Sequence, residues 1–162
     1  MEQLEKISRF LNQVLIWIGG FFLVAMILLT CANIFLRLVW TPVRGTFELM
    51  GFFSAVVTAF ALGYTQIHRG HIGIDILVNG FSATAQRILS GINYAICMVF
   101  FSIAGWQIAR WATVLRKTGE VTETLRIIFY PFTYAVAFGC LILALVLLVD
   151  LLKVFFQGEG IS

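Results

Sequence analysis

The run VLIWIGGFFLVAMILLTCANIFL, residues 14–36, contains no charged side chain. Crossing the roughly 30 Å hydrocarbon core of a bilayer takes about 20 helical residues. Lipid offers no hydrogen-bond partner to backbone N–H and C=O groups, so an uncharged run of this length must be helical. The run therefore predicts a transmembrane helix.

Three further uncharged runs follow it, at residues 49–67, 88–109 and 127–149. The composition agrees, because 60% of the 162 residues are hydrophobic and only 12% are charged. Soluble domains carry about 25% charged residues. The sequence predicts an all-α membrane protein with four transmembrane helices in a single integral-membrane domain, residues 1–162. Four spans would place both chain ends on the same side of the membrane.

The segment before the first span has its own pattern. Apolar residues recur in it at spacings of three and four: Leu4, Ile7, Leu11 and Val14. Polar residues fall mostly elsewhere on the helical wheel: Glu2, Glu5, Arg9 and Asn12. This pattern predicts a short N-terminal amphipathic helix that lies in the membrane interface. The alternative is that the segment simply extends the first span.

The charges do not decide the orientation. Five basic residues fall on the side of the termini and six on the other side, whereas the positive-inside rule needs a clear excess. The formal net charge of +3 is small and scattered along the chain. Nucleic-acid binding, which needs a clustered basic surface, therefore has no support.

The stretch YTQIHRGHIGID, residues 64–75, holds both histidines of the chain. His68, His71 and Asp75 could in principle hold a metal ion. The alternative is a polar turn between two spans, in which Gly70 lets the chain bend and His71 and Asp75 hydrogen-bond to the backbone. We favour the turn, and predict neither a metal site nor a cofactor.

Glu48 opens the second span. A carboxylate at a helix N-terminus is stabilised by the helix dipole, and Arg44 is a possible ion-pair partner. The alternative is a proton-coupling role, because ionisable groups within membranes usually serve a function. We favour a structural cap.

Ala55, Ala59 and Gly63 follow one another at a spacing of four along the second span. In lipid, close packing of helices depends on small residues of this kind. The ridge predicts a packing face, either within the helix bundle or against a partner protein.

The middle of each span lacks charge, and the chain has no Ser–His–Asp or Cys–His arrangement. A self-sufficient ion-coupled carrier usually has charged or helix-breaking features near the midplane. The sequence therefore favours a scaffold for another membrane protein over an enzyme. Two alternatives stay open: a small four-helix multidrug-type carrier, and the membrane anchor of a redox enzyme.

The stretch FELMGFFSAVVTAFALGYTQIHRGHIGID, residues 47–75, resembles the central motif of the small membrane subunit of TRAP (tripartite ATP-independent periplasmic) transporters, the DctQ family. In that family a Glu opens the second span, a Gly lies near its end, and a turn of the form G-x-H-I-x-V/I-D follows. The matching residues here are Glu48, Gly63, Gly70, His71, Ile72, Ile74 and Asp75. The family often has two acids where this chain has Phe47 and Glu48. Size, four spans and motif order extend the resemblance over nearly the whole chain.

The resemblance implies a function beyond what the residues show. The small subunit of such a transporter binds a large multi-span membrane subunit, which holds the substrate and sodium sites for symport. A periplasmic substrate-binding protein delivers the substrate, usually an organic acid. The expected location is the bacterial inner membrane, with lipid around the helices and both termini in the cytoplasm.

Overall fold

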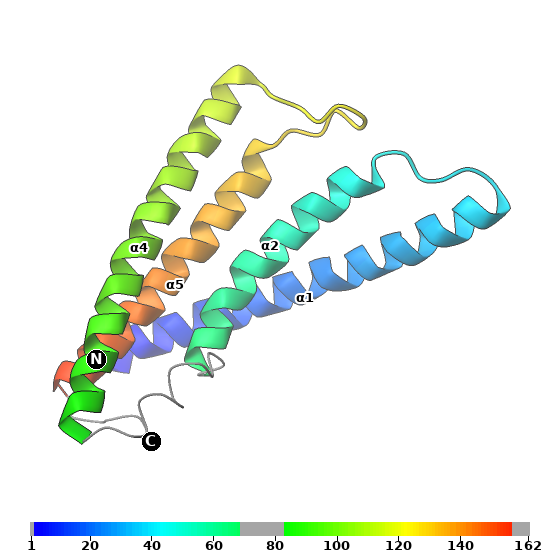
Figure 1. Ribbon diagram of the computed structural model, residues 1–162. Coiled ribbons are helices and arrows are strands. Elements are labelled where there is room, and N and C mark those ends of the chain that lie inside the picture. The colour runs from blue at the N-terminus through cyan, green and yellow to red at the C-terminus, as the bar shows by residue number, and fades with distance from the viewer. Residues whose placement is uncertain (1, 69–82, 157–162) are drawn as a thin grey trace.

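A computed structural model describes residues 2–68 and 83–156 (Figure 1). Its helices are α1 (Glu2–Val39), α2 (Thr46–Ile67), α4 (Ala83–Thr118) and α5 (Tyr130–Phe156). Within the described residues, four helices are long and apolar enough to cross a membrane. The prediction of an all-α chain with four such helices is confirmed.

The four helices form two pairs rather than a closed bundle. α5 packs against α4 and α2, and α2 packs in turn against α1. The α1–α2 pair and the α4–α5 pair converge at one end and diverge toward the other (Figure 1). We call the converging end, where α1 begins and α5 ends, the closed end, and the opposite end the open end. At the closed end, Lys153 of α5 lies 3.0 Å from the carboxylate of Glu5 on α1.

The core lies where α1, α2 and α5 meet. Its buried members are all apolar: Leu15, Val56, Ala59, Phe60 and Ile142. The backbones of α2 and α5 touch here, because a Cβ atom on Gly139 would lie 2.7 Å from the carbonyl oxygen of Ala59. Apolar side chains gain little by leaving lipid, so close approach at small residues is what holds such helices together.

Aromatic rings fill the space between α2 and α5 toward the open end. Phe52 of α2 stacks on Phe132 of α5 with ring centroids 4.4 Å apart and an interplanar angle of 12°. The ring of Phe129 meets the Phe52 ring edge-on, with ring centroids 5.2 Å apart. The two helices thus stay in contact beyond the point where their backbones separate.

The chain between α4 and α5 forms a short hairpin, residues 119–129. Val121 and Ile128 make an antiparallel bridge, and the N–H of Thr122 donates to the carbonyl of Ile127 at 2.9 Å. The hairpin extends from the α4–α5 pair toward α2 (Figure 1). It links the two helix pairs across the open end.

The predicted interfacial helix at the N-terminus is wrong. α1 is one continuous, apolar helix from Glu2 to Val39. A separate interfacial helix would need a bend before the span, but Ser8 and Asn12 are buried against the neighbouring helices, which keeps this segment in line with the span. Ile7 and Phe10 instead point outward, with 51% and 69% of their surface exposed.

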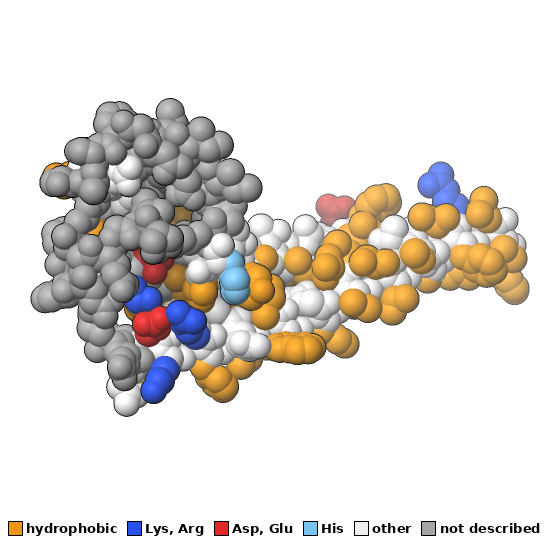
Figure 2. Space-filling view, turned by 90° about the horizontal axis from the view of Figure 1, so that it is seen from below, with side chains coloured by type: hydrophobic (Ala, Val, Ile, Leu, Met, Phe, Trp, Pro, Cys, Tyr) orange, Lys and Arg blue, Asp and Glu red, His pale blue; other side chains and the backbone are white. Residues whose placement is uncertain are grey.

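The outer surface of the helices is apolar. Only 11% of the most apolar window of α1 is buried within the chain, and 17% of that of α4. Figure 2 shows hydrophobic side chains along the length of the helices and basic side chains toward both ends. This is the distribution expected of a protein whose sides face lipid or other membrane helices.

Candidate functional site

Glu48, in the first turn of α2, binds the backbone of the 119–129 hairpin. One carboxylate oxygen accepts a hydrogen bond from the N–H of Thr124 at 2.7 Å, and the other accepts from the N–H of Leu125 at 3.0 Å. Hydrogen bonds to an ionised acceptor are roughly twice as strong as neutral ones. Glu48 therefore holds the tip of the hairpin against the beginning of α2.

Arg44 is not the partner of Glu48. In the part of the chain that the structure describes, the ion pairs join Glu5 to Arg9 and to Lys153. The sequence placed Glu48 correctly at the N-terminus of α2. It gave no sign of the hairpin backbone, which lies 76 residues farther along the chain.

Gly45 completes the contact between α2 and the hairpin. Its backbone lies in the left-handed region with φ 74°, and a Cβ atom there would overlap the side chain of Leu125. Glycine reaches this conformation without strain and leaves room for the leucine. On the other side of the loop, the side-chain oxygen of Asn33 accepts a hydrogen bond from the N–H of Val43 at 2.9 Å. The beginning of α2 is thus fixed from both sides.

The small-residue ridge of α2 lies partly inside the chain. Ala59 packs against Gly139 of α5, and a Cβ atom on Gly63 would overlap the side-chain oxygen of Asn12 on α1. Ala55 is exposed. Two of the three predicted packing residues therefore contact helices of this same chain.

A polar cluster at the closed end was not anticipated from the sequence. The Asn12 side chain is 1% exposed and donates to the carbonyl of Ser8 at 2.9 Å. Nearby, the amide of Gln66 donates to the carboxylate of Asp150 at 3.1 Å, which joins α2 to α5. The available signal was the placement of Ser8 and Asn12, two uncharged polar residues, at a helical spacing of four. In a membrane, such residues usually face the protein interior.

The histidine stretch lies mostly outside the described residues, and so do Gly70, His71 and Asp75. His68 is described: its Nδ1 lies 3.0 Å from the carbonyl oxygen of Tyr64, and the two rings are 4.0 Å apart. Across the described part of the chain, no group of three or more His, Cys, Asp and Glu residues is placed to hold a metal ion. The roles of Gly70, His71 and Asp75 in a turn remain predictions.

In these contacts, polar groups fix helix ends and small residues fix helix crossings. No curated protein and no solved structure matches the chain. Residues 26–157 match the family described as tripartite ATP-independent periplasmic transporters, DctQ component. That match covers α2, α4 and α5 in full, and the part of α1 from residue 26 onward. The chain belongs to the DctQ family and is a component of a TRAP transporter rather than a member of an enzyme family.

Proposed function

We propose that the chain is a static scaffold for the large membrane subunit of its transporter. That transporter would take up organic acids by sodium symport, from a periplasmic binding protein. The observation that carries this proposal is the absence of charge from the middle of all four spans, residues 14–36, 49–67, 88–109 and 127–149. Transport of an anion with sodium requires polar groups near the midplane. The proposal therefore assigns those groups to the other subunit.

The internal contacts support a rigid body. α2 and α5 touch through Ala59 and Gly139, and Glu48 ties the hairpin to α2 at the open end. Lys153 and Glu5 join α5 to α1 at the closed end. Helices that are joined to one another at both ends and at the centre form a rigid unit. Such a unit can stay still while another subunit moves.

The residues singled out in the sequence have the following proposed roles. Glu48 is a structural cap, and Gly70, His71 and Asp75 form a turn that, with both termini in the cytoplasm, faces the cytoplasmic side of the inner membrane. Ala55 is the exposed member of the ridge, and we assign it to contact with the large subunit. The ridge then serves the chain's own packing through Ala59 and Gly63, and assembly through Ala55.

Co-purification tests this assignment. A tagged chain, expressed with the large subunit, should retain that subunit through detergent extraction. Ala55→Leu should reduce the amount retained, because extra bulk at a close helix contact typically costs about 1–3 kcal/mol. Val57→Leu, on another side of α2, is the control. Full retention by Ala55→Leu would move the interface to another helix, and a wild-type chain that never retains the subunit would contradict the scaffold itself.

A further inference from the structure

The outer side of α1 carries a shallow, open hollow, lined by Ile16, Trp17, Gly20, Phe21 and Val24 of this one helix. Trp17 and Phe21 project from the helix and are 74% and 71% exposed. Gly20 forms the floor, since a Cβ atom there would meet no heavy atom within 4 Å. The hollow is therefore a groove between two large rings, open because a glycine lies between them.

Basic side chains lie on the same helix, nearer the closed end. Lys6 and Arg9 are both exposed. The carboxylate of Glu5 lies 2.6 Å from Arg9 and 3.0 Å from Lys153, so one anion is shared by two cations. Lys6 makes no ion pair within the described residues, so its charge is available to an anionic group.

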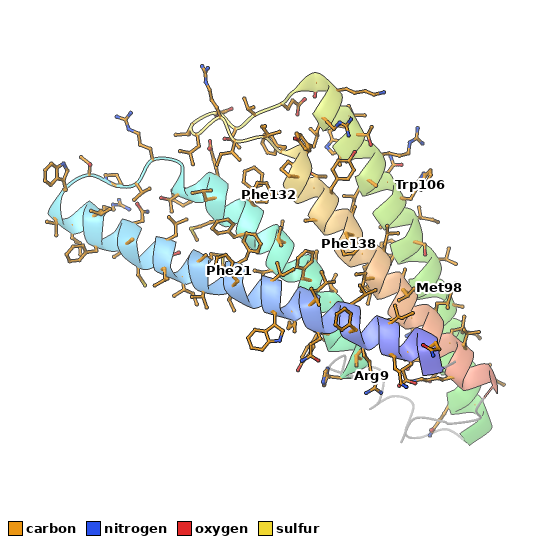
Figure 3. All side chains as sticks on the ribbon, turned by 180° about the vertical axis from the view of Figure 1, so that it is seen from behind. Arg9, Phe21, Met98, Trp106, Phe132 and Phe138 are labelled. Atoms are coloured by element: carbon orange, nitrogen blue, oxygen red, sulfur yellow. The ribbon has the colours of Figure 1, made fainter. Side chains whose placement is uncertain are left out.

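The cations and the hollow share one face of α1. The residues along this face are spaced by three or four, which places them in line on a helix: Lys6, Arg9, Gln13, Trp17, Gly20 and Val24. In Figure 3, Arg9 lies at the converging end of the helices and Phe21 lies farther along α1. At a rise of about 1.5 Å per residue, the hollow extends from about 10 to about 23 Å beyond Arg9.

The order of groups along this face is cation, amide, indole and apolar groove. A phospholipid presents the complementary order of phosphate, polar backbone and acyl chain, and one leaflet supplies about half of the 30 Å hydrocarbon core. Indole rings favour the boundary between these zones. We propose that this face of α1 binds one anionic phospholipid, with its phosphate against Lys6 and Arg9 and an acyl chain in the hollow at Gly20.

Basic and aromatic residues also collect at membrane interfaces without binding a particular lipid. The hollow separates the two cases, because a general interfacial preference does not depend on the shape of the helix below the headgroups. The proposal therefore requires that filling the hollow, without touching any charge, weakens lipid binding.

The test uses the full-length chain in mild detergent, with phosphatidylglycerol or phosphatidylcholine of identical acyl chains added at known concentrations. Native mass spectrometry counts the bound lipid. The wild-type chain should retain phosphatidylglycerol over phosphatidylcholine. Lys6→Gln and Arg9→Gln should each lower the affinity for phosphatidylglycerol roughly fivefold, since a basic residue near an anionic lipid surface contributes about that factor. Arg110→Gln, an exposed charge on α4, is the control and should change nothing.

Gly20→Phe fills the hollow and should lower the affinity for both lipids. Its matched control is Gly51→Phe on α2, where a Cβ atom also meets no heavy atom within 4 Å. Should Gly20→Phe fail to fold, Gly20→Ala adds one methyl group in open space and should show a smaller loss of the same sign.

Three results would overturn the proposal. The first is equal lipid binding by Gly20→Phe and Gly51→Phe, and the second is equal retention of the two lipids by the wild-type chain. The third is a Gly20→Phe chain that binds lipid normally but no longer co-purifies with the large subunit, because the hollow would then seat a protein helix. None of these results would contradict the scaffold proposal.

Discussion

Gly139 of α5 and Ala59 of α2 bring two helix backbones into direct contact. A Cβ atom on Gly139 would lie 2.7 Å from the carbonyl oxygen of Ala59 and 2.9 Å from its carbonyl carbon. Backbone atoms cannot move aside as the end of a flexible side chain can. This crossing therefore sets the distance between the two helix pairs.

Gly139→Ala should destabilise the chain by about 1–3 kcal/mol through overpacking. The exposed Gly51 on α2 provides the matched control, because Gly51→Ala meets open space and should stabilise the helix by roughly 0.5–1 kcal/mol. Thermal unfolding of both variants in the same detergent measures the difference. A melting temperature that moves the same way in both would show that the crossing is looser than described.

Gly63→Leu and Ala59→Leu should each lower the thermal stability of the chain, because both residues contact neighbouring helices. Val57→Leu should have little effect. Gly63 meets the buried Asn12, so Asn12→Ala should recover part of the stability lost in Gly63→Ala, with a coupling of about 0.5–3 kcal/mol. Strict additivity of the Asn12 and Gly63 variants would mean that the two side chains do not share this space.

Glu48→Gln should loosen the tip of the 119–129 hairpin. A glutamine offers one acceptor oxygen and no charge, whereas Glu48 accepts from Thr124 and Leu125 with both oxygens. The amides of these two residues should exchange faster with deuterium, as measured by hydrogen-exchange mass spectrometry. Glu123→Gln, on the hairpin itself, is the control. Unchanged exchange in Glu48→Gln would show that the hairpin is held by its other contacts, such as Leu125 with Gly45.

His71→Ala and Asp75→Ala should weaken assembly with the large subunit without changing metal content. We expect this because both side chains are assigned to hydrogen bonds in a turn. Elemental analysis of the purified wild-type chain and the double variant is the measurement. A stoichiometric metal in the wild type that disappears from the double variant would identify a metal site instead.

The spans were predictable because hydrocarbon imposes a simple rule on length and charge. Residues 14–36, 49–67 and 88–109 all lie within the helices α1, α2 and α4. The last prediction began at residue 127, whereas α5 begins at Tyr130 because residues 127–129 belong to the hairpin. Apolar composition does not distinguish a strand-like turn at a membrane surface from the first turn of a helix.

The long-range contacts were not predictable in the same way. The sequence marked Glu48 and Gly63 as special, but the partners of both residues lie on other elements: the backbone of Thr124 and the side chain of Asn12. Spacing within a helix reports which residues share a face, and not what that face meets. The prediction of an N-terminal interfacial helix was wrong for the same reason, because Asn12 was placed on the polar side of the segment but is buried.

Reconstitution tests the scaffold account most directly. Liposomes would contain this chain alone, the large subunit alone, or both, with the periplasmic binding protein outside, an inward sodium gradient and labelled organic acids. The account predicts no uptake by this chain alone, because its spans carry no midplane charge, and sodium-dependent uptake when both subunits are present. Robust uptake by this chain without a second membrane subunit would contradict it.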